Sequence, residues 1–112
     1  GMPGTLNLGE HAGVNETIKS FAAEGKLVAA VCAAPSVLGQ AGLLQGRKAA
    51  CYPGYEDQLT GAEVVYGEVA EDSNIITSRG MGTAIAFALR ITAYLAGEEK
   101  ARELAEKIIY RQ

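Results

Sequence analysis

The stretch Val28-Ala29-Ala30-Val31-Cys32-Ala33-Ala34-Pro35 predicts the class of the fold. Residues 26–32 form a short apolar run, which is typical of a buried parallel strand when helices lie on either side of it. Pro35 suits the first turn of a helix, where a backbone N–H is not needed. The chain therefore passes from a strand into a helix at Cys32. A side chain at such a turn projects from the carboxyl end of the sheet, where α/β proteins bind ligands.

Helices and strands alternate outward from this stretch. Apolar residues at a helical spacing predict helices over four segments, 11–24, 34–45, 82–96 and 98–111. Short apolar runs predict strands over 26–32, 48–52, 63–69 and 74–78. Strands that alternate with helices in this way predict an α/β domain with a mainly parallel sheet.

The remaining segments carry weaker signals. Residues 1–10 contain Gly and Pro without any periodicity, so we expect a loop there. We also expect a helical turn over 55–61 and a turn over 70–73, between the last two strands. The helix over 82–96 is apolar nearly all round, which predicts that it is buried on several sides.

Length and composition restrict the class of protein. The chain has 112 residues, which suits one domain, and 48% of them are apolar and 21% charged, as in ordinary globular proteins. A net charge of -3 offers no basic surface for nucleic acid or for an anionic membrane. The apolar stretches are too short to span a bilayer. The N-terminus lacks the basic and apolar segments of a signal peptide, so we expect a cytoplasmic protein.

Cysteine and histidine usage indicates thiol chemistry rather than a metal site. Both cysteines, Cys32 and Cys51, lie in apolar strand-like runs, which favours reduced thiols over a disulfide framework. His11 is the only histidine, and it lies at the start of a surface helix. No Cys/His cluster has the spacing of metal ligands, so we expect neither a metal nor another cofactor.

Cys32 is the candidate for chemistry. The free N–H groups at the start of the following helix would stabilise a thiolate, and they could also hold an oxyanion. This is the logic of the nucleophile elbow, with cysteine in place of serine. The alternative is a structural cysteine, because free cysteine is among the most buried residue types. Cys51 has no helix start after it, and we expect it to lie in the core.

Three motifs carry a resemblance to a known family. They are V-C-A-A-P at 31–35, C-Y-P-G-Y-E-D at 51–57 and I-I-T-S-R-G-M-G-T at 75–83. Together they resemble the ThiJ/PfpI superfamily, also called the DJ-one superfamily, and within it the bacterial ThiJ-like proteins. The opening G-M-P-G-T-L-N-L also resembles the loop that follows the P-G-G strand end of that family.

The resemblance implies the fold and the extent of the domain. It implies a flavodoxin-like three-layer sandwich that forms a homodimer. Residues 1–112 would be a single partial domain, the C-terminal part of a ThiJ-like protein, in which the first strand–helix units are absent. The strand over 26–32, central in the intact fold, would then lie at an edge of the sheet.

The resemblance also implies roles for residues of the site. Cys32 would be the reactive, oxidation-prone thiol, and the N–H of Ala33 would form an oxyanion pocket with a glycine at the place of Gly1. Four further pocket residues would be Tyr52, Pro53, Gly80 and Met81. The family pairs its cysteine with a glutamate from the first strand–helix unit, which would precede Gly1. Tyr52 stands where many members have histidine, and a phenol is a poor base at neutral pH.

Three functions remain open at this point. The first is glyoxalase- or deglycase-like chemistry on a small reactive carbonyl compound, through a hemithioacetal on Cys32. The second is a non-enzymatic redox-sensing or chaperone-like stress protein. The third and weaker one is a PfpI-type cysteine peptidase, since those members carry histidine where this chain has Ala33. We expect the chain by itself to be inactive. We also expect it to form a homo-oligomer or to associate with an N-terminal fragment.

Overall fold

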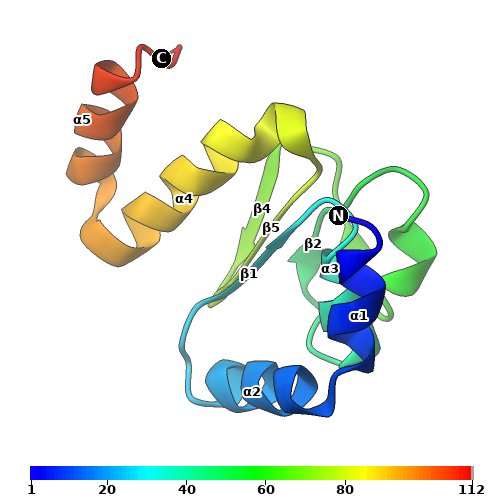
Figure 1. Ribbon diagram of the computed structural model, residues 1–112. Coiled ribbons are helices and arrows are strands. Elements are labelled where there is room, and N and C mark those ends of the chain that lie inside the picture. Colours follow the sequence, from blue (N-terminus) through cyan, green and yellow to red (C-terminus); the bar gives the residue numbers. More distant parts are fainter. Residues whose placement is uncertain (112) are drawn as a thin grey trace.

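The computed structural model describes residues 1–111 and contains helices and strands in alternation (Figure 1). The helices are α1 (Gly4–Glu10), α2 (Ala12–Ala23), α3 (Pro35–Gln40), α4 (Ala84–Ala96) and α5 (Glu98–Lys107), with short 3-10 turns η1 (Glu56–Gln58) and η2 (Met81–Thr83). The strands are β1 (Val28–Val31), β2 (Lys48–Ala49), β3 (Glu63–Val64), β4 (Val69–Asp72) and β5 (Ile75–Ser78). The predicted α/β class is confirmed.

The described strands form two small sheets. Three strands pair in the order β1-β5-β4, with β1 parallel and β4 antiparallel to β5. The register places Val28 opposite Ile75 and Val31 opposite Ser78. Strands β2 and β3 form a separate parallel pair. The sheet is therefore mixed, and a mainly parallel character is not established by these pairings.

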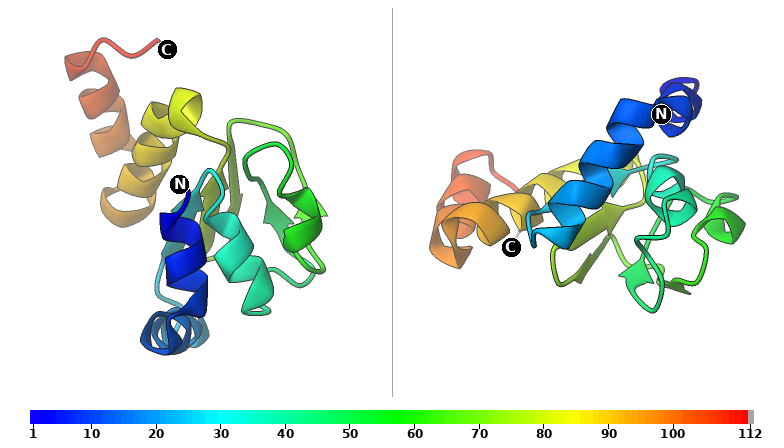
Figure 2. Two further views of the ribbon diagram at one scale, coloured as in Figure 1. Left: turned by 45° about the vertical axis from the view of Figure 1, so that its right-hand side comes forward. Right: turned by 90° about the horizontal axis from the view of Figure 1, so that it is seen from below.

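The elements lie in layers around the three-stranded sheet. Helices α4 and α5 lie on one side of it, and α3 lies with the β2–β3 pair on the other (Figures 1 and 2). The main core fills the second of these spaces, because the apolar faces of the sheet, α3 and β2 all point into it. Its buried members are Val28, Leu38, Leu44, Ala49, Cys51, Leu59 and Ile75.

The first ten residues do not form the predicted loop. Helix α1 occupies Gly4–Glu10, and it starts after Pro3, a residue that suits the beginning of a helix. Thr5 fixes this start, because its hydroxyl donates to the carbonyl of Gly1 at 3.0 Å and its side chain is buried. His11 ends α1 and caps α2: its Nδ1 accepts the N–H of Val14 at 3.1 Å.

The turn predicted over 70–73 is also wrong. Residues Val69–Asp72 form β4, and the chain turns at Ser73, whose φ is 55°. The acidic pair in β4 looked like turn chemistry, yet both side chains have distant partners. Glu71 forms an ion pair with Arg90, and Asp72 accepts the N–H of Lys48 at 2.8 Å. Such partners lie outside the range of a local sequence pattern.

Helix α4 is less buried than its sequence predicts. None of its residues is fully buried within the described part of the chain, and Leu95 is 70% exposed. The sheet covers one side of α4 and α5 covers another, which leaves Ile85 and Tyr94 partly in solvent. Among the described residues, no helix combines the length and the hydropathy that crossing a bilayer requires.

Candidate functional site at the β1–α3 turn

Cys32 follows the last residue of β1 and adopts a backbone conformation that side chains rarely accept. Its φ is 69°, in the left-handed region that favours glycine. A non-glycine residue in that region costs roughly 1–2 kcal/mol. The surrounding structure must hold this conformation in place, and such held strain is concentrated at functional sites. We call the turn Cys32–Ala34 the elbow.

Both backbone polar groups of Cys32 are held by neighbouring strands or loops. Its N–H donates to the carbonyl of Ser78, at the end of β5, with a distance of 3.1 Å. Its carbonyl accepts the N–H of Tyr52 at 2.8 Å. These two bonds come from opposite sides of the residue, and together they fix the direction in which the side chain leaves the backbone. Cys32 as a whole residue is partly exposed.

The N–H of Ala33 is the group that the family resemblance implies for binding an oxyanion, and this role stays a prediction. The residue is only 2% exposed, and its N–H donates to no other described residue. Its carbonyl accepts the hydroxyl of Ser36 at 2.7 Å, which fixes the turn before α3. A buried N–H without an acceptor costs about 1–3 kcal/mol. An oxygen placed beside the Cys32 thiol would remove this cost.

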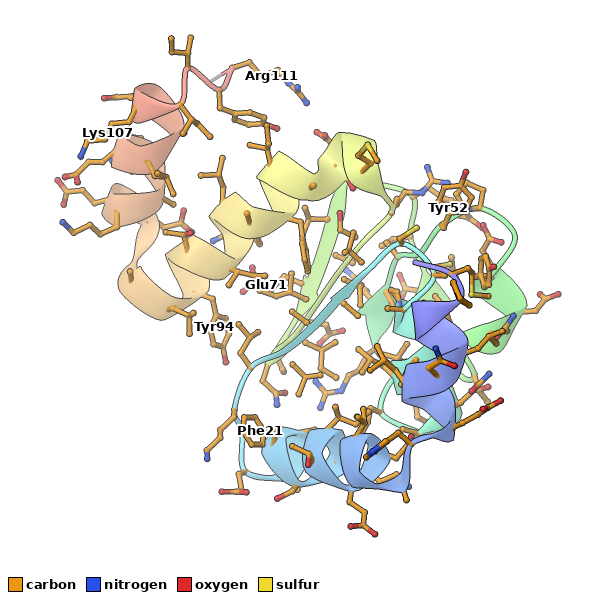
Figure 3. The ribbon with its side chains drawn as sticks, in the orientation of Figure 1. Phe21, Tyr52, Glu71, Tyr94, Lys107 and Arg111 are labelled. Carbon is orange, nitrogen blue, oxygen red and sulfur yellow. The ribbon has the colours of Figure 1, made fainter. Side chains whose placement is uncertain are left out.

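The other predicted pocket residues lie at different distances from the elbow. Tyr52, which Figure 3 labels, donates its backbone N–H to Cys32. A Cβ added at Gly80 would lie 3.5 Å from the Tyr52 ring. Gly1 lines an apolar cavity of about 320 Å³ together with Val31 and Ala34, which flank Cys32. The structure thus brings Gly1, Tyr52 and Gly80 to the region of the elbow.

Pro53 and Met81 are exposed, as are Gly1 and Tyr52, but no described contact joins Pro53 or Met81 to Cys32. Pro53 lies in the exposed turn after Tyr52. Met81 begins η2 and is 93% exposed, so its side chain extends into solvent. Their participation in a pocket stays a prediction.

The sequence analysis did not assign a role to Ser78 or Thr83, which organise the loop beside the elbow. The Thr83 hydroxyl lies 2.6 Å from the Ser78 hydroxyl and accepts the N–H groups of Arg79 and Gly80 at 3.2 and 3.1 Å. A hydroxyl residue three positions after Gly80, at the start of a helix, was a signal that could have indicated this bonding pattern.

Cys51 differs from Cys32 in its burial and in its position in the chain. It is 3% exposed and belongs to the main core, as predicted. Burial, with the nearby carboxylate of Glu56, raises the pKa of the Cys51 thiol from 9.0 to about 11, although Arg79 partly opposes the shift. A thiol with this pKa stays protonated at neutral pH, and the thiolate is the nucleophilic form. Cys51 is therefore not a candidate nucleophile.

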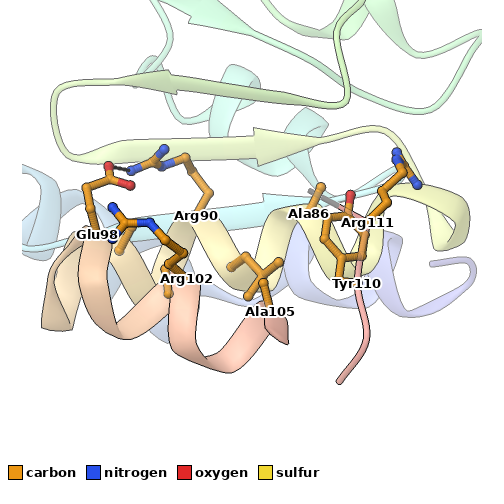
Figure 4. Close-up of a pocket in the computed structure, with 10 residues that line it drawn as sticks. Ala86, Arg90, Glu98, Arg102, Ala105, Tyr110 and Arg111 are labelled. Atoms are coloured by element: carbon orange, nitrogen blue, oxygen red, sulfur yellow. Dashed lines mark hydrogen bonds and ion pairs between the residues drawn. The ribbon is translucent and has the colours of Figure 1, made fainter. Parts of the chain in front are cut away.

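A cavity of about 350 Å³ with both apolar and charged lining residues lies between α4 and α5, away from the elbow (Figure 4). Arg90 forms ion pairs there with Glu71, at 2.9 Å, and with Glu98, and the Glu98 hydrogen bond is the main cause that raises the pKa of Arg90. These carboxylates compensate its charge. Within residues 1–111, no group of three or more His, Cys, Asp or Glu side chains could hold a metal ion.

Comparison with known proteins identifies relatives over the whole chain. The model of the DJ-1/PfpI family matches residues 1–94. Protein dj-1beta of Drosophila melanogaster is 40% identical over 97% of the chain. The glutathione-independent glyoxalase DJR-1.2 of Caenorhabditis elegans is 34% identical over 96% of it, and an isonitrile hydratase of Pseudomonas putida is 35% identical over 97%.

Solved structures agree with these sequence matches. The crystal structure of Drosophila melanogaster DJ-1beta has a TM-score of 0.94 at 39% identity, and it covers 100% of the chain. The structure of oxidized Toxoplasma gondii DJ-1 has a TM-score of 0.93 at the same identity and coverage. The fold of the chain is thus that of DJ-1 proteins, which is consistent with the expected flavodoxin-like fold.

The matches also show what share of its relatives' length the chain spans, and from which organisms these relatives come. It spans 59% of the fruit fly and nematode relatives, 50% of the hydratase and 61% of both solved structures. Animal proteins are among these relatives, so the predicted likeness to bacterial members in particular is not specific. The family itself is shown by the match to residues 1–94 and by the close structural agreement, and the chain belongs to the DJ-1/PfpI family.

Proposed function

We propose that Cys32 is the nucleophile of a site for small reactive carbonyl compounds, with glyoxalase- or deglycase-like chemistry. The observation that carries the proposal is the elbow itself. Cys32 is held at a φ of 69° next to the buried, unpaired N–H of Ala33. A nucleophile beside an oxyanion donor is the arrangement that addition to a carbonyl group requires. The relationship to the nematode glyoxalase supports this substrate class.

In the first step the Cys32 thiolate adds to the carbonyl carbon. A carbon–sulfur bond forms, the π bond of the carbonyl breaks, and its electron pair moves to the oxygen. The N–H of Ala33 stabilises this oxyanion, which then takes a proton from water to give a hemithioacetal. The step needs no oxidant or reductant.

Later proton transfers need a second group. The described contact of Tyr52 with the elbow is made by its backbone N–H and not by its phenol. We propose that the acid–base group comes from the part of the relatives that this chain does not span. Removal of a positioned acid–base group lowers rates by roughly 10²–10⁴-fold, so the 112-residue chain by itself should turn over methylglyoxal very slowly.

Substrate protection tests the proposed first step. The chain is treated with limiting iodoacetamide at pH 7, with and without methylglyoxal, and labelled cysteines are identified by mass spectrometry. We expect labelling at Cys32, a lower labelling rate when methylglyoxal is present, and little labelling at Cys51. Equal labelling of the two cysteines, or a Cys32 rate that methylglyoxal leaves unchanged, would contradict the proposal.

A second candidate function is redox sensing without turnover, as in a stress-response protein. The related Toxoplasma gondii DJ-1 structure is that of an oxidized protein, and the Ala33 N–H that would hold a carbonyl oxygen would equally hold an oxygen of a Cys32 sulfinate. Treatment with hydrogen peroxide should then add two oxygen atoms at Cys32 before Cys51 changes. A peptidase is less well supported, because Ala33 stands where PfpI-type peptidases have histidine.

We also propose a cytoplasmic protein that works as a homo-oligomer. The two described cysteines are free thiols, which favours a reducing compartment. Exposed apolar side chains on α4 and beside β1 favour association with further protein. No part of the proposal requires a cofactor.

A further inference from the structure

Two peptide groups form hydrogen bonds with Cys32. Each of them also forms a hydrogen bond with a side chain of the Ser78–Thr83 segment. The peptide between Cys51 and Tyr52 donates its N–H to the Cys32 carbonyl. The peptide between Ser78 and Arg79 accepts the N–H of Cys32. The strained residue therefore depends on the orientation of two peptide planes, and whatever fixes those planes also fixes the elbow.

Arg79 fixes the first peptide plane. Its Nε donates to the carbonyl of Cys51 at 3.4 Å, on the side of the peptide opposite to the bond with Cys32. The guanidinium also lies over the ring of Tyr66, 5.6 Å from its centroid, and this contact limits its movement. The arginine side chain is thus held between an aromatic face and a backbone carbonyl.

Thr83 fixes the second peptide plane. Its hydroxyl accepts the N–H of Arg79 at 3.2 Å, while the carbonyl of the same peptide accepts the N–H of Cys32 at 3.1 Å. The hydroxyl also accepts the N–H of Gly80 and donates to the carbonyl of that residue, at 3.1 and 3.0 Å. Loss of this hydroxyl would free the peptide that anchors the N–H of Cys32.

We propose that Arg79 and Thr83 are positioning residues for the nucleophile. They keep Cys32 in its left-handed conformation, and this conformation places the thiol beside the Ala33 N–H. Without them the two peptides can rotate, and Cys32 relaxes toward the ordinary negative φ that non-glycine residues prefer. The inference rests on the proposed function, because it assigns these residues a part in the reactivity of Cys32.

The test compares alkylation of Cys32 in matched variants. Arg79→Met and Thr83→Val remove the supporting groups. Arg47→Met and Thr92→Val are the controls, because the Arg47 side chain also bonds to a backbone carbonyl, that of Asp72, and the Thr92 hydroxyl bonds to Ala88 within its own helix. The second-order rate constant with iodoacetamide is measured from pH 6 to pH 10, with the labelled residue identified by mass spectrometry.

We expect each test variant to lower the Cys32 rate by about five- to tenfold, the effect of losing one hydrogen bond. The reduction should be the same at every pH from 6 to 10. A change of charge alone would instead give a reduction that varies with pH. Thr83→Ser keeps the hydroxyl and should restore the rate to within about twofold of that of the unchanged chain.

The outcomes separate this inference from the proposed function. If Cys32 of the unchanged chain reacts no faster than Cys51, both proposals are overturned. If Cys32 of the unchanged chain reacts rapidly and the Arg79 and Thr83 variants have the same rate constant, only the positioning role is overturned. The positioning role is also overturned if the control variants lower the rate constant as much as the test variants do. Should Arg79→Met fail to fold, Arg79→Lys replaces it, since lysine keeps the charge and lacks the Nε–H, and the same reduction is expected.

Discussion

At the scale of single residues, the elbow shows how a fold can hold a side chain where its own backbone preference would not place it. Cys32 has an unfavourable φ of 69°, and two other parts of the chain, at Tyr52 and Ser78, supply the bonds that hold it. The strain is local and the support is distant. A substitution at Cys32 should therefore reveal the strain directly.

Glycine should be the better tolerated of two small replacements at Cys32. In helices and strands, glycine is less stable than alanine by about 0.5–1 kcal/mol. In the left-handed region the order reverses, because alanine carries the Cβ penalty of about 1–2 kcal/mol and glycine does not. We expect Cys32→Gly to exceed Cys32→Ala by about 1 kcal/mol in the free energy of unfolding, measured with urea. The opposite order would show that φ at this position is not strained.

Cys51 should make stability depend on pH in the alkaline range. Its pKa in the folded chain is about 11, above its ordinary value of 9.0, mainly because of burial. Between these values the unfolded chain has lost the thiol proton and the folded chain has kept it. The unfolded state then binds fewer protons, so the free energy of unfolding falls as pH rises from about 9 to about 11.

Comparison with Cys51→Ala isolates this effect. Alanine has no proton to lose, so the free energy of unfolding of the Cys51→Ala variant should fall less steeply above pH 9 than that of the unchanged chain. At pH 7 the variant should have the lower free energy of unfolding. Urea unfolding at a series of pH values measures both slopes. Parallel curves for the two proteins would show that Cys51 does not ionise differently on folding.

At the scale of elements, sequence patterns predicted those strands and helices whose character is set by nearby residues. The strand before Cys32, the helix before it and the helix after Gly97 all occur close to the predicted ranges. The elbow was predictable for the same reason, since an apolar run, a cysteine and Pro35 are adjacent in the chain. The predicted strand over 48–52 shrinks to Lys48–Ala49, because its later residues turn toward the elbow.

Features set by distant partners could not be predicted in this way. Strand β4 contains two acidic residues whose partners, Arg90 and Lys48, come from elsewhere in the chain. The hydrogen bonds of Arg79 and Thr83 likewise depend on the tertiary fold, which brings the Cys51–Tyr52 peptide close to the elbow. The apolar pattern of α4 predicts that other elements pack against this helix, but it does not identify those elements.

Asn74 should be a critical link between α2 and the sheet. It is buried, and its amide donates to the carbonyls of Ala22 at 3.2 Å and Lys26 at 2.9 Å. Removal of the amide takes this partner from the Lys26 carbonyl, near the start of β1, whereas the Ala22 carbonyl still accepts the N–H of Gly25 at 3.1 Å. We expect Asn74→Ala to lower the free energy of unfolding by about 1–3 kcal/mol.

Asn15→Ala provides the matched control for this link. The Asn15 amide also donates to two carbonyls, those of Gly9 and His11, but this pair lies nearer to the surface, where water can replace the bonds. Its loss should cost less than about 1 kcal/mol. Similar costs in both variants, measured by urea unfolding, would show that Asn74 does not link the two elements.

At the scale of the whole molecule, β1 is an open edge of the three-stranded sheet as far as residues 1–111 describe it. Val28 donates to Asn74, just before β5, and Cys32 donates to Ser78 at its end. Bonds in a parallel ladder alternate, so the N–H groups of Ala29 and Val31 point away from β5. An apolar cavity of about 320 Å³ lies along this edge, between α1, α2 and α4. Open apolar edges pair with other strands.

We expect the chain to self-associate through β1 at micromolar concentration, or to bind an added N-terminal fragment of a relative in its place. Light scattering measures the mass in solution. Ala29→Pro removes an N–H that points outward and should reduce the association, whereas Ala29→Ser keeps that N–H and should not. A monodisperse, cooperatively folded monomer would contradict the expectation, since it would show that the β1 edge is not available.

The order in which the chain is made has a consequence for the chemistry of the elbow. Cys32 leaves the ribosome well before Tyr52, Ser78 and the Arg79 and Thr83 side chains that hold it. At roughly 5–20 residues per second, this interval lasts a few seconds. During it no partner imposes the left-handed conformation, and the Ala33 N–H is free to bond to water. In a nascent chain the Cys32 thiol therefore lacks the surroundings that we propose make it reactive, and it acquires them only when β5 joins β1.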